Sequence, residues 1–140
     1  MPLPETMRAV RVYGVGDYRL ETIPVPRPRP GEVLVRVLAT GICASDVKTF
    51  AGARVWGSEE IAPYIVAPVT PGHEFVGEVV ALGEGAGERT GLAIGDHAVS
   101  EQIVPCWQCR FCRRGQYWMC QRHDIYGFIR DRAEGSWAEY

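Results

Sequence analysis

The sequence predicts a mainly β protein, an antiparallel barrel or sandwich with few short helices. Three observations indicate this fold class: several short strand-like segments, glycine and proline between them, and almost no helical periodicity. The 140 residues include 16 glycines and 10 prolines. A chain of this length is expected to form one domain and to bury about two-thirds of the surface that it exposes when unfolded.

The predicted strands follow the pattern of apolar residues. Residues 1–6 contain two prolines and few apolar side chains, so we expect a flexible leader before a folded domain at residues 7–140. Apolar and charged residues alternate from Met7 to Tyr13, as in a strand with one buried face. Residues 32–39 are nearly all apolar and rich in β-branched side chains. The predicted strands are residues 7–13, 18–23, 32–39, 74–82, 98–104 and 136–140.

One short helix and one glycine-rich turn are expected between the strands. Ser45 and Asp46 can cap a helix that ends near Ala51. The stretch from Gly83 to Gly85 resembles part of a dinucleotide-binding loop, but the third glycine of that motif is missing at the required spacing. We expect no helix to follow, so this stretch is predicted to be a turn, and no cofactor-binding residue is assigned.

Four of the five cysteines cluster between residues 106 and 120, with the spacing C-x2-C-x2-C-x7-C. Cysteines two residues apart can turn both sulfurs toward one point. Four thiolates at about 2.3 Å complete the tetrahedron of a zinc ion and leave no open position, so such a site is structural. Its binding energy becomes folding energy. We therefore predict a zinc-stapled loop lobe at about residues 105–123, held by Cys106, Cys109, Cys112 and Cys120.

Disulfides and an iron–sulfur cluster are the alternatives for these cysteines. The odd cysteine count, the close spacing and the lack of a signal-peptide pattern argue against disulfides and favour a cytoplasmic protein. The ferredoxin pattern has its fourth cysteine after three residues, followed by proline. Here Cys120 comes after seven residues and Gln121 follows it, so zinc is the favoured ion.

Cys43 and the pair His73-Glu74 form a second candidate group. They supply a thiolate, an imidazole and a carboxylate, each beside a glycine or a loop. Three protein ligands with an open fourth position are typical of a catalytic zinc, and Asp46 can hold the second nitrogen of His73. The alternative is a cysteine that packs as a small apolar residue and a structural histidine.

A long loop at residues 52–71 joins these two ligand motifs. It contains several glycines and prolines, and loops of this length inside compact domains are usually functional. Its Trp56 and Tyr64 are candidates for the apolar wall of a substrate pocket. Simple packing of both rings on the barrel is the alternative.

The motifs occur in a fixed order: Gly-Ile-Cys-x-Ser-Asp at 41–46, Gly-His-Glu at 72–74, Gly-Asp-His-Ala-Val at 95–99, and then the four cysteines. This order resembles the zinc-containing medium-chain alcohol dehydrogenase family, and the resemblance covers residues 7–140. It implies the amino-terminal catalytic domain of that family, which has a GroES-like β-barrel fold.

The resemblance also implies roles for individual residues. Cys43 and His73 match catalytic zinc ligands, and Glu74 matches a glutamate that ligates the metal or lies just outside it. Ser45 matches the hydroxyl that relays a proton from the alcohol, and Asp46 matches the aspartate that hydrogen-bonds the zinc histidine. The implied ligands of the structural zinc are Cys106, Cys109, Cys112 and Cys120.

The activity implied by the resemblance is oxidation of a small-molecule alcohol or polyol by hydride transfer to NAD(P). Ala44 stands where some members carry an arginine toward the cofactor pyrophosphate, which favours the sorbitol or threonine dehydrogenase branch. The nucleotide-binding half of the family lies beyond residue 140. We therefore expect the isolated chain to be inactive and not to bind NAD(P), and the full-length form to be a homo-oligomer.

Two other functions stay open on the sequence. A self-contained zinc-stabilised binding module is suggested by the basic side chains of the cysteine segment, and an iron–sulfur electron carrier by its spacing. The net charge is −2 and the pI is near 5.9, so we expect no nucleic-acid partner. The sequence has no apolar run of the ~20 residues that a membrane-spanning helix needs, so we expect no membrane partner. We also expect unpaired backbone and apolar surface at residues 136–140, and hence self-association there.

Overall fold

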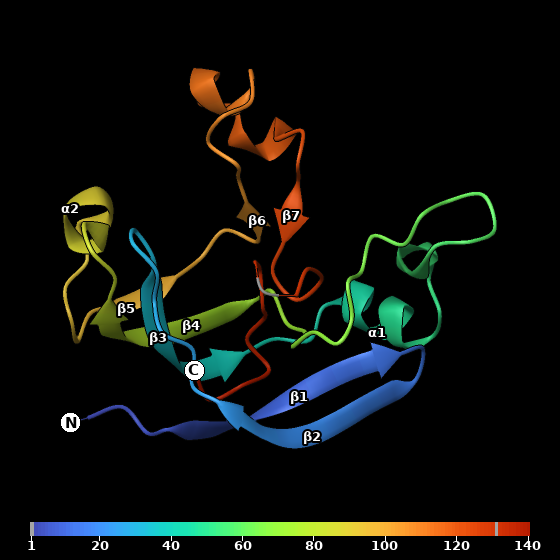
Figure 1. Ribbon diagram of the computed structural model, residues 1–140, viewed down its shortest axis with the longest axis horizontal. Helices are drawn as coiled ribbons and strands as arrows, with labels where there is room; N and C mark the ends of the chain where they lie inside the picture. The colour runs from blue at the N-terminus through green and yellow to red at the C-terminus, as the bar shows by residue number, and fades with distance from the viewer. Residues whose placement is uncertain (1, 131) are drawn as a thin grey trace.

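The computed structural model describes residues 2–130 and 132–140, which form three antiparallel sheets and two short α-helices (Figure 1). The elements are β1 (Thr6–Gly14), β2 (Asp17–Pro24), β3 (Val33–Thr40), α1 (Ala44–Phe50), the 3-10 turn η1 (Arg54–Trp56), β4 (Phe75–Leu82), α2 (Ala86–Thr90), β5 (His97–Val99), β6 (Ile103–Val104), the 3-10 turns η2 (Cys112–Arg114) and η3 (Tyr117–Met119), and β7 (Asp124–Ile125). The prediction of a mainly β protein with few short helices is confirmed.

The β1–β2 hairpin follows the alternation of its residues. Met7, Ala9 and Val12 are buried, because every second side chain of a strand faces the same side. A register shift between Val12 and Gly14 interrupts the pairing near the turn. The observed strands extend the predicted ones, 7–13 and 18–23, by one residue at each end.

The largest sheet has the order β3-β4-β5. β4 is its central strand, and Val79 of β4 is fully buried. Two register shifts, one of them between Leu34 and Val35, interrupt the β3–β4 pairing, and such irregularities increase the local twist of a strand pair. The strands predicted at 32–39 and 74–82 are both present, and each begins one residue later than predicted.

The single strand predicted at residues 98–104 is wrong. β5 pairs with residues 76–78 of β4, whereas β6 pairs with β7 in a different sheet. The chain changes sheets at residues 100–102, and no strand can remain paired across that change. Apolar residues lie on both sides of the break, so the sequence pattern predicted one continuous strand.

The expectation that no helix follows the Gly83–Gly85 turn is also wrong. α2 begins directly after it, with Ala86 fully buried and the Thr90 hydroxyl donating to the Ala86 carbonyl at 2.7 Å. The helix is only five residues long. It caps the end of β4 at the upper left of Figure 1 and does not open a βαβ unit.

Residues 135–139, which we call the strap, hydrogen-bond to three other segments. The Val10 N–H donates to the Trp137 carbonyl at 2.8 Å, and the Val37 N–H donates to the Glu139 carbonyl at 3.0 Å. The strap therefore links β1 to β3. A continuous strand was expected at 136–140, but the structure has only an isolated bridge between Ala9 and Ala138. The strap carbonyls of Trp137 and Glu139 are therefore paired rather than open to solvent.

Two clusters of buried side chains hold the sheets together. The first joins β1, the loop before β4 and the segment after β7, and its buried members are Val12, Ile65, Val69, Phe128, Ile129 and Ala133. The second is formed by Met7, Val25 and Leu34, with Leu3 packed against it. Near its start, the chain is also held by the Val25 N–H, which donates to the Glu5 carbonyl at 3.0 Å.

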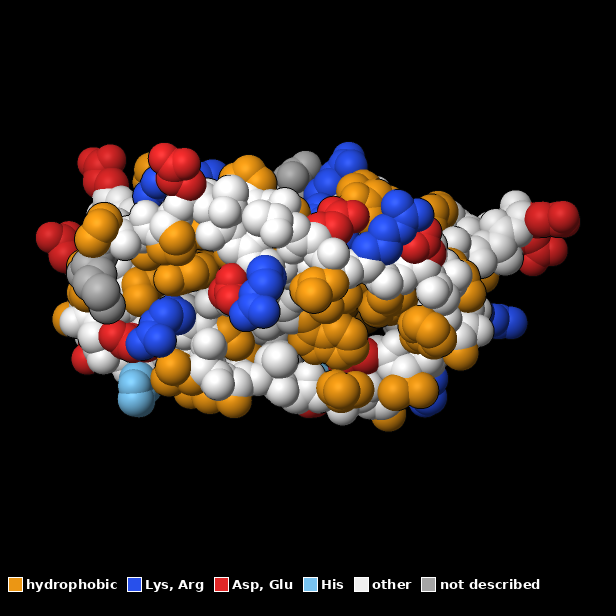
Figure 2. Space-filling view, turned by 90° about the horizontal axis from the view of Figure 1, so that it is seen from below, with side chains coloured by type: hydrophobic (Ala, Val, Ile, Leu, Met, Phe, Trp, Pro, Cys, Tyr) orange, Lys and Arg blue, Asp and Glu red, His pale blue; other side chains and the backbone are white. Residues whose placement is uncertain are grey.

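The face below the hairpin carries charges of both signs. Figure 2 shows lysine or arginine side chains beside acidic ones over this surface, with apolar side chains between them. Ion pairs on the protein surface include Arg8–Glu139 and Arg19–Asp17. This face therefore has no extended field of one sign. Within residues 2–130 and 132–140, none of the helices has the length and apolar character needed to cross a bilayer.

Replacing Gly135 by alanine tests whether the strap must lie in direct contact with the backbone of Pro71 and Gly72. A Cβ at this position would lie 2.3 Å from the carbonyl oxygens of both Pro71 and Gly72, and backbone atoms cannot swing aside. Gly135→Ala should lower the free energy of unfolding by about 2 kcal/mol or more, measured by urea denaturation. Gly14→Ala is the matched control, because its Cβ would meet nothing within 4 Å. Equal losses in both variants would contradict the close-approach argument.

Candidate metal centres

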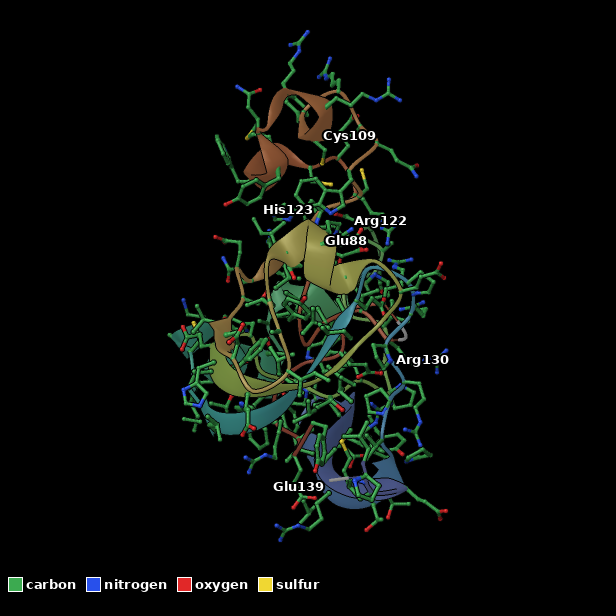
Figure 3. All side chains as sticks on the ribbon, turned by 90° about the vertical axis from the view of Figure 1, so that its left-hand side faces the viewer. Glu88, Cys109, Arg122, His123, Arg130 and Glu139 are labelled. Carbon is green, nitrogen blue, oxygen red and sulfur yellow. The ribbon has the colours of Figure 1, made fainter. Side chains whose placement is uncertain are left out.

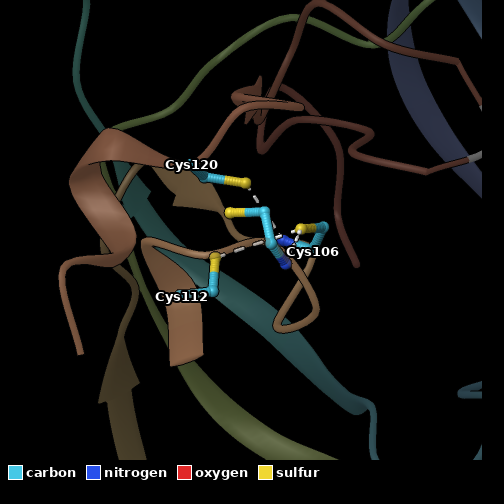
Figure 4. Close-up of side chains that lie close together, drawn as sticks. Cys106, Cys112 and Cys120 are labelled. Atoms are coloured by element: carbon cyan, nitrogen blue, oxygen red, sulfur yellow. Dashed lines mark hydrogen bonds between the residues drawn. The ribbon is translucent and has the colours of Figure 1, made fainter. Parts of the chain in front are cut away.

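The cysteine lobe, residues 105–123, leaves the body of the protein between β6 and β7. Its four sulfur atoms, from Cys106, Cys109, Cys112 and Cys120, all lie within 4.8 Å of one another. Figure 4 shows the sulfurs of the labelled cysteines gathered around one space, and the Cys106 and Cys112 sulfurs are 4.0 Å apart. Sulfurs bound to one tetrahedral zinc at about 2.3 Å are about 3.8 Å apart. The donor set and its spacing therefore fit zinc.

Backbone N–H groups point at these sulfurs. The Cys109 N–H donates to the Cys106 sulfur at 3.3 Å, and the Cys106 N–H donates to the Cys120 sulfur at the same distance. The 3-10 turns η2 and η3 bring Cys112 and Cys120 back toward the first two cysteines. Such donors favour thiolates, which are the form that binds a metal.

The pKa values of the Cys109 and Cys112 thiols are shifted in opposite directions. The Cys112 backbone N–H is the main reason that the pKa of Cys109 falls to about 6. Burial raises the pKa of the Cys112 thiol to about 12, and its hydrogen bonds to neighbouring cysteine sulfurs act in the same direction. Thiolates packed this closely repel one another, and a divalent cation is the ligand that balances their charge.

A buried carboxylate anchors the base of the lobe. Asp124 is 2% exposed and accepts hydrogen bonds from Arg122 at 2.6 Å and from Arg132 at 3.0 Å. The Tyr64 hydroxyl donates to the carbonyl of His123, and burial followed by the nearby Asp124 carboxylate raises the Tyr64 pKa. Figure 3 shows Arg122 and His123 at this base, below Cys109. These contacts fix how the lobe meets the body.

The second group brings Cys43, His73 and Glu74 together. One ligand atom from each lies within 4.8 Å of the other two, although 30 residues of chain separate the first from the second. Cys43 stands at the start of α1, and the other two residues immediately precede β4. The Gly41 N–H donates to the Glu74 carbonyl at 2.7 Å, which holds the two segments side by side.

Asp46 contacts both segments of this group. One carboxylate oxygen accepts the Cys43 N–H at 2.8 Å, and the other lies 3.6 Å from Nδ1 of His73. Ser45 and Asp46 are the predicted capping residues of this helix. The helix begins at Ala44 with Cys43 as the N-cap, and Asp46 completes the capping box from the third helical position.

The two ring nitrogens of His73 have different neighbours, the Asp46 carboxylate and the Ser45 hydroxyl. Nδ1 is buried and has no hydrogen-bond partner among the described residues, and Asp46 is the carboxylate beside it. Nε2 lies 3.4 Å from the Ser45 hydroxyl. A proton on Nδ1 shared with Asp46 would leave the Nε2 lone pair free for a metal, so this orphaned nitrogen fits a ligated histidine.

Trp56 and Tyr64 pack against the first core cluster. The Trp56 indole N–H donates to the Thr49 carbonyl at 2.8 Å, and the Tyr64 ring lies 5.8 Å from that of Phe128. Packing on the body is therefore present for both rings. Their role as the wall of a substrate pocket stays a prediction.

The sequence analysis missed residues that contact the ligand segments from the strap. The Trp137 indole N–H donates to the Gly41 carbonyl at 3.2 Å, and the Ser136 hydroxyl lies 2.7 Å from that of Thr40. No local pattern marks these residues, because the contacts arise from pairing between distant parts of the chain. The strand predicted at 136–140 was the one sequence signal that this segment pairs with another part of the chain.

Comparison with known proteins confirms the resemblance to the alcohol dehydrogenase family. The family model described as the alcohol dehydrogenase GroES-like domain matches residues 29–140. The chain belongs to this family. Erythritol/L-threitol dehydrogenase of Mycolicibacterium smegmatis is 56% identical to this GroES-like domain over 139 residues, which are 99% of the chain and 38% of the relative.

Solved structures agree with this GroES-like assignment. A cobalt- and zinc-bound thermostable alcohol dehydrogenase from Pyrobaculum aerophilum has a TM-score of 0.75 at 33% identity, over 96% of this chain and 38% of that one. A structure described as a short chain alcohol dehydrogenase from Escherichia coli CFT073, complexed with NADH, has a TM-score of 0.77 at 26% identity, over 97% of this chain and 35% of that one. The GroES-like domain thus spans less than two-fifths of the proteins that it resembles.

Cys120→Ser tests the four-cysteine centre of the GroES-like domain. Loss of one of four thiolates should remove tightly bound zinc from the lobe and open residues 105–123 to protease, because the metal provides folding energy there. Zinc per chain is measured by elemental analysis, and cleavage by limited proteolysis. Cys43→Ser is the control that should keep the lobe protected. A Cys120→Ser protein that retains zinc and protection would refute the centre.

Asp46→Asn tests the link between the carboxylate and the second centre. The amide is close in size to the carboxylate, but it cannot accept the Nδ1 proton with the strength of a charged oxygen. Metal affinity at the Cys43, His73 and Glu74 group should fall about 10- to 100-fold, while the lobe keeps its zinc. Chelator competition measures both sites. Unchanged affinity would show that Asp46 only caps the helix.

Proposed function

We propose that this chain is the catalytic-domain portion of a zinc-dependent alcohol or polyol dehydrogenase, which oxidises an alcohol by hydride transfer to NAD(P). The observation that carries the proposal is the convergence of Cys43, His73 and Glu74, separate from the four-cysteine cluster. A closed four-thiolate site has no open position for a substrate, whereas a site with three protein donors does.

In the proposed enzyme, Cys43 and His73 hold a catalytic zinc, and Glu74 is a direct or closely neighbouring ligand. The four lobe cysteines hold a structural zinc. A bound catalytic zinc would supply Lewis acidity that lowers the pKa of the substrate hydroxyl. The relatives' metal content supports this choice, since the Pyrobaculum aerophilum structure is bound to cobalt and zinc.

Ser45 takes the proton in this proposal. Its hydroxyl lies 3.4 Å from Nε2 of His73, at the edge of the ligand group. A bound nicotinamide would supply the acceptor for the hydride, that is, for the substrate C–H hydrogen with its electron pair, and the alcohol would become a carbonyl compound. The hydroxyl proton leaves through Ser45 to solvent, so charge and atoms balance. Asp46 and His73 keep the site oriented throughout.

The substrate class is proposed from the relatives. The Mycolicibacterium smegmatis relative is an erythritol/L-threitol dehydrogenase, and others are L-threonine 3-dehydrogenases and a sorbitol dehydrogenase. We therefore propose a small polyol as substrate, with NAD(P) bound by a nucleotide-binding half that lies outside residues 1–140. This chain alone supplies no residue to which we assign cofactor binding. The whole enzyme is proposed to be cytoplasmic and a homo-oligomer.

A chimera tests the proposed activity. Residues 1–140 replace the matching segment of the Mycolicibacterium smegmatis erythritol/L-threitol dehydrogenase, which is 56% identical. The chimera should oxidise erythritol with NAD(P), followed by nicotinamide absorbance. His73→Ala in the chimera should reduce kcat by more than about 100-fold. Removing a metal ligand should cost more activity than removing a residue that only contacts a ligand, which typically costs about 10- to 100-fold.

The control is His97→Ala, since His97 is an exposed histidine of β5 outside the two ligand groups. It should leave kcat within about twofold of the chimera. A correctly folded chimera with two zincs but no dehydrogenase activity would refute the proposed function. So would full activity after His73→Ala.

A further inference from the structure

Trp137 lies between the two chain segments that carry Cys43 and His73. Its indole N–H donates to the carbonyl of Gly41 at 3.2 Å, and Gly41 is two residues before Cys43. Its backbone N–H donates to the carbonyl of Pro71 at 2.9 Å, and Pro71 is two residues before His73. Trp137 therefore donates one hydrogen bond to each ligand segment, and each bond lies two residues before the metal-ligand residue.

The indole ring also lies directly against the residue before His73. A Cβ added at Gly72 would lie 2.4 Å from Cδ1 of Trp137, and the backbone of Gly72 has φ +97, which side chains rarely adopt. The neighbouring Ser136 N–H donates to the Gly72 carbonyl at 3.1 Å. Displacing Trp137 would therefore change the position of Gly72 and of the histidine attached to it.

The Trp137 ring is also connected, through Tyr18, to the helix that carries Ser45 and Asp46. The Trp137 and Tyr18 rings are 6.3 Å apart, and Tyr18 lies 5.2 Å from Phe50, the last residue of α1. Burial, and then the Asp46 carboxylate, which accepts the Cys43 N–H, raise the pKa of Tyr18. Trp137 is held on this side by an aromatic row.

We propose that Trp137 is a positioning residue of the Cys43, His73 and Glu74 site, and that it sets the separation of the two ligand segments. The inference rests on the proposed function, because it assumes that this group binds a metal. The indole acts through a fixed ring between Gly41 and Gly72. Loss of its N–H lets the Gly41 segment move relative to His73, which misplaces the ligands and weakens metal binding.

The test measures metal binding rather than activity. The 140-residue protein with one equivalent of zinc, held by the four-cysteine cluster, is titrated with Co²⁺ in the presence of a competing chelator. Visible absorption of the second metal gives its Kd. Trp137→Phe keeps a ring but removes the donor, and it should raise this Kd at least about tenfold while the lobe zinc stays bound.

Two matched variants separate positioning from general stability. Leu34→Ala removes a buried side chain from the other core cluster and should lower the melting temperature without changing the Kd of the second metal. Trp118→Phe changes an exposed tryptophan of the lobe and should change neither quantity. If Trp137→Phe does not fold, benzothienylalanine at position 137 keeps the ring shape and still removes the donor.

The outcomes distinguish the inference from the function on which it rests. A parent protein that binds only one metal overturns both. A parent that binds two metals, with Trp137→Phe or the benzothienylalanine protein showing the parent's Kd, overturns the role of Trp137 alone. An equal increase in the Kd of the second metal in Leu34→Ala and Trp137→Phe overturns it as well, because the effect would then come from lower overall stability. A loss confined to the position-137 variants supports the inference.

Discussion

Pro71 and Gly72 lie so close to the strap that side-chain atoms on Gly72 or Gly135 would overlap their neighbours. Thr70 accepts the Gly135 N–H at 2.7 Å, while Val69 exchanges two backbone hydrogen bonds with Val12 of β1. The segment before His73 is therefore fixed from both sides. The strap in turn reaches β3 through Glu139, so one close backbone contact connects the hairpin, the large sheet and the histidine.

Electrostatics adds a second constraint at the same place. Asp46 is 5% exposed, and burial of a carboxylate is costly unless donors surround it. The Cys43 N–H is one donor, and Nδ1 of His73 faces the other oxygen. The cost of burying the charge is reduced only when the thiol segment and the imidazole are both in place. A single carboxylate thus makes the two halves of the candidate site depend on each other.

The parts of the structure that the sequence could predict are those encoded by neighbouring residues. The alternation at 7–13 and the β-branched run at 32–39 identify strands, and the cysteine spacing identifies the lobe, because each signal is local. The break at residues 100–102, the short α2 and the contacts of Trp137 were not predictable. Each depends on which distant segment pairs with which, and a single sequence carries no direct record of that pairing.

The same long-range pairing has a consequence for how the chain folds. Arg8 and Glu139 are joined by hydrogen bonds although 131 residues separate them, and Val10 pairs with Trp137 beside them. Closing so large a loop costs entropy before any contact compensates, which slows folding in proteins of high contact order. During synthesis on the ribosome, β1 emerges early but cannot complete its hydrogen bonding until residue 139 has left the exit tunnel. Until then one edge of the first hairpin is exposed, and transient protection by a chaperone would act at that edge.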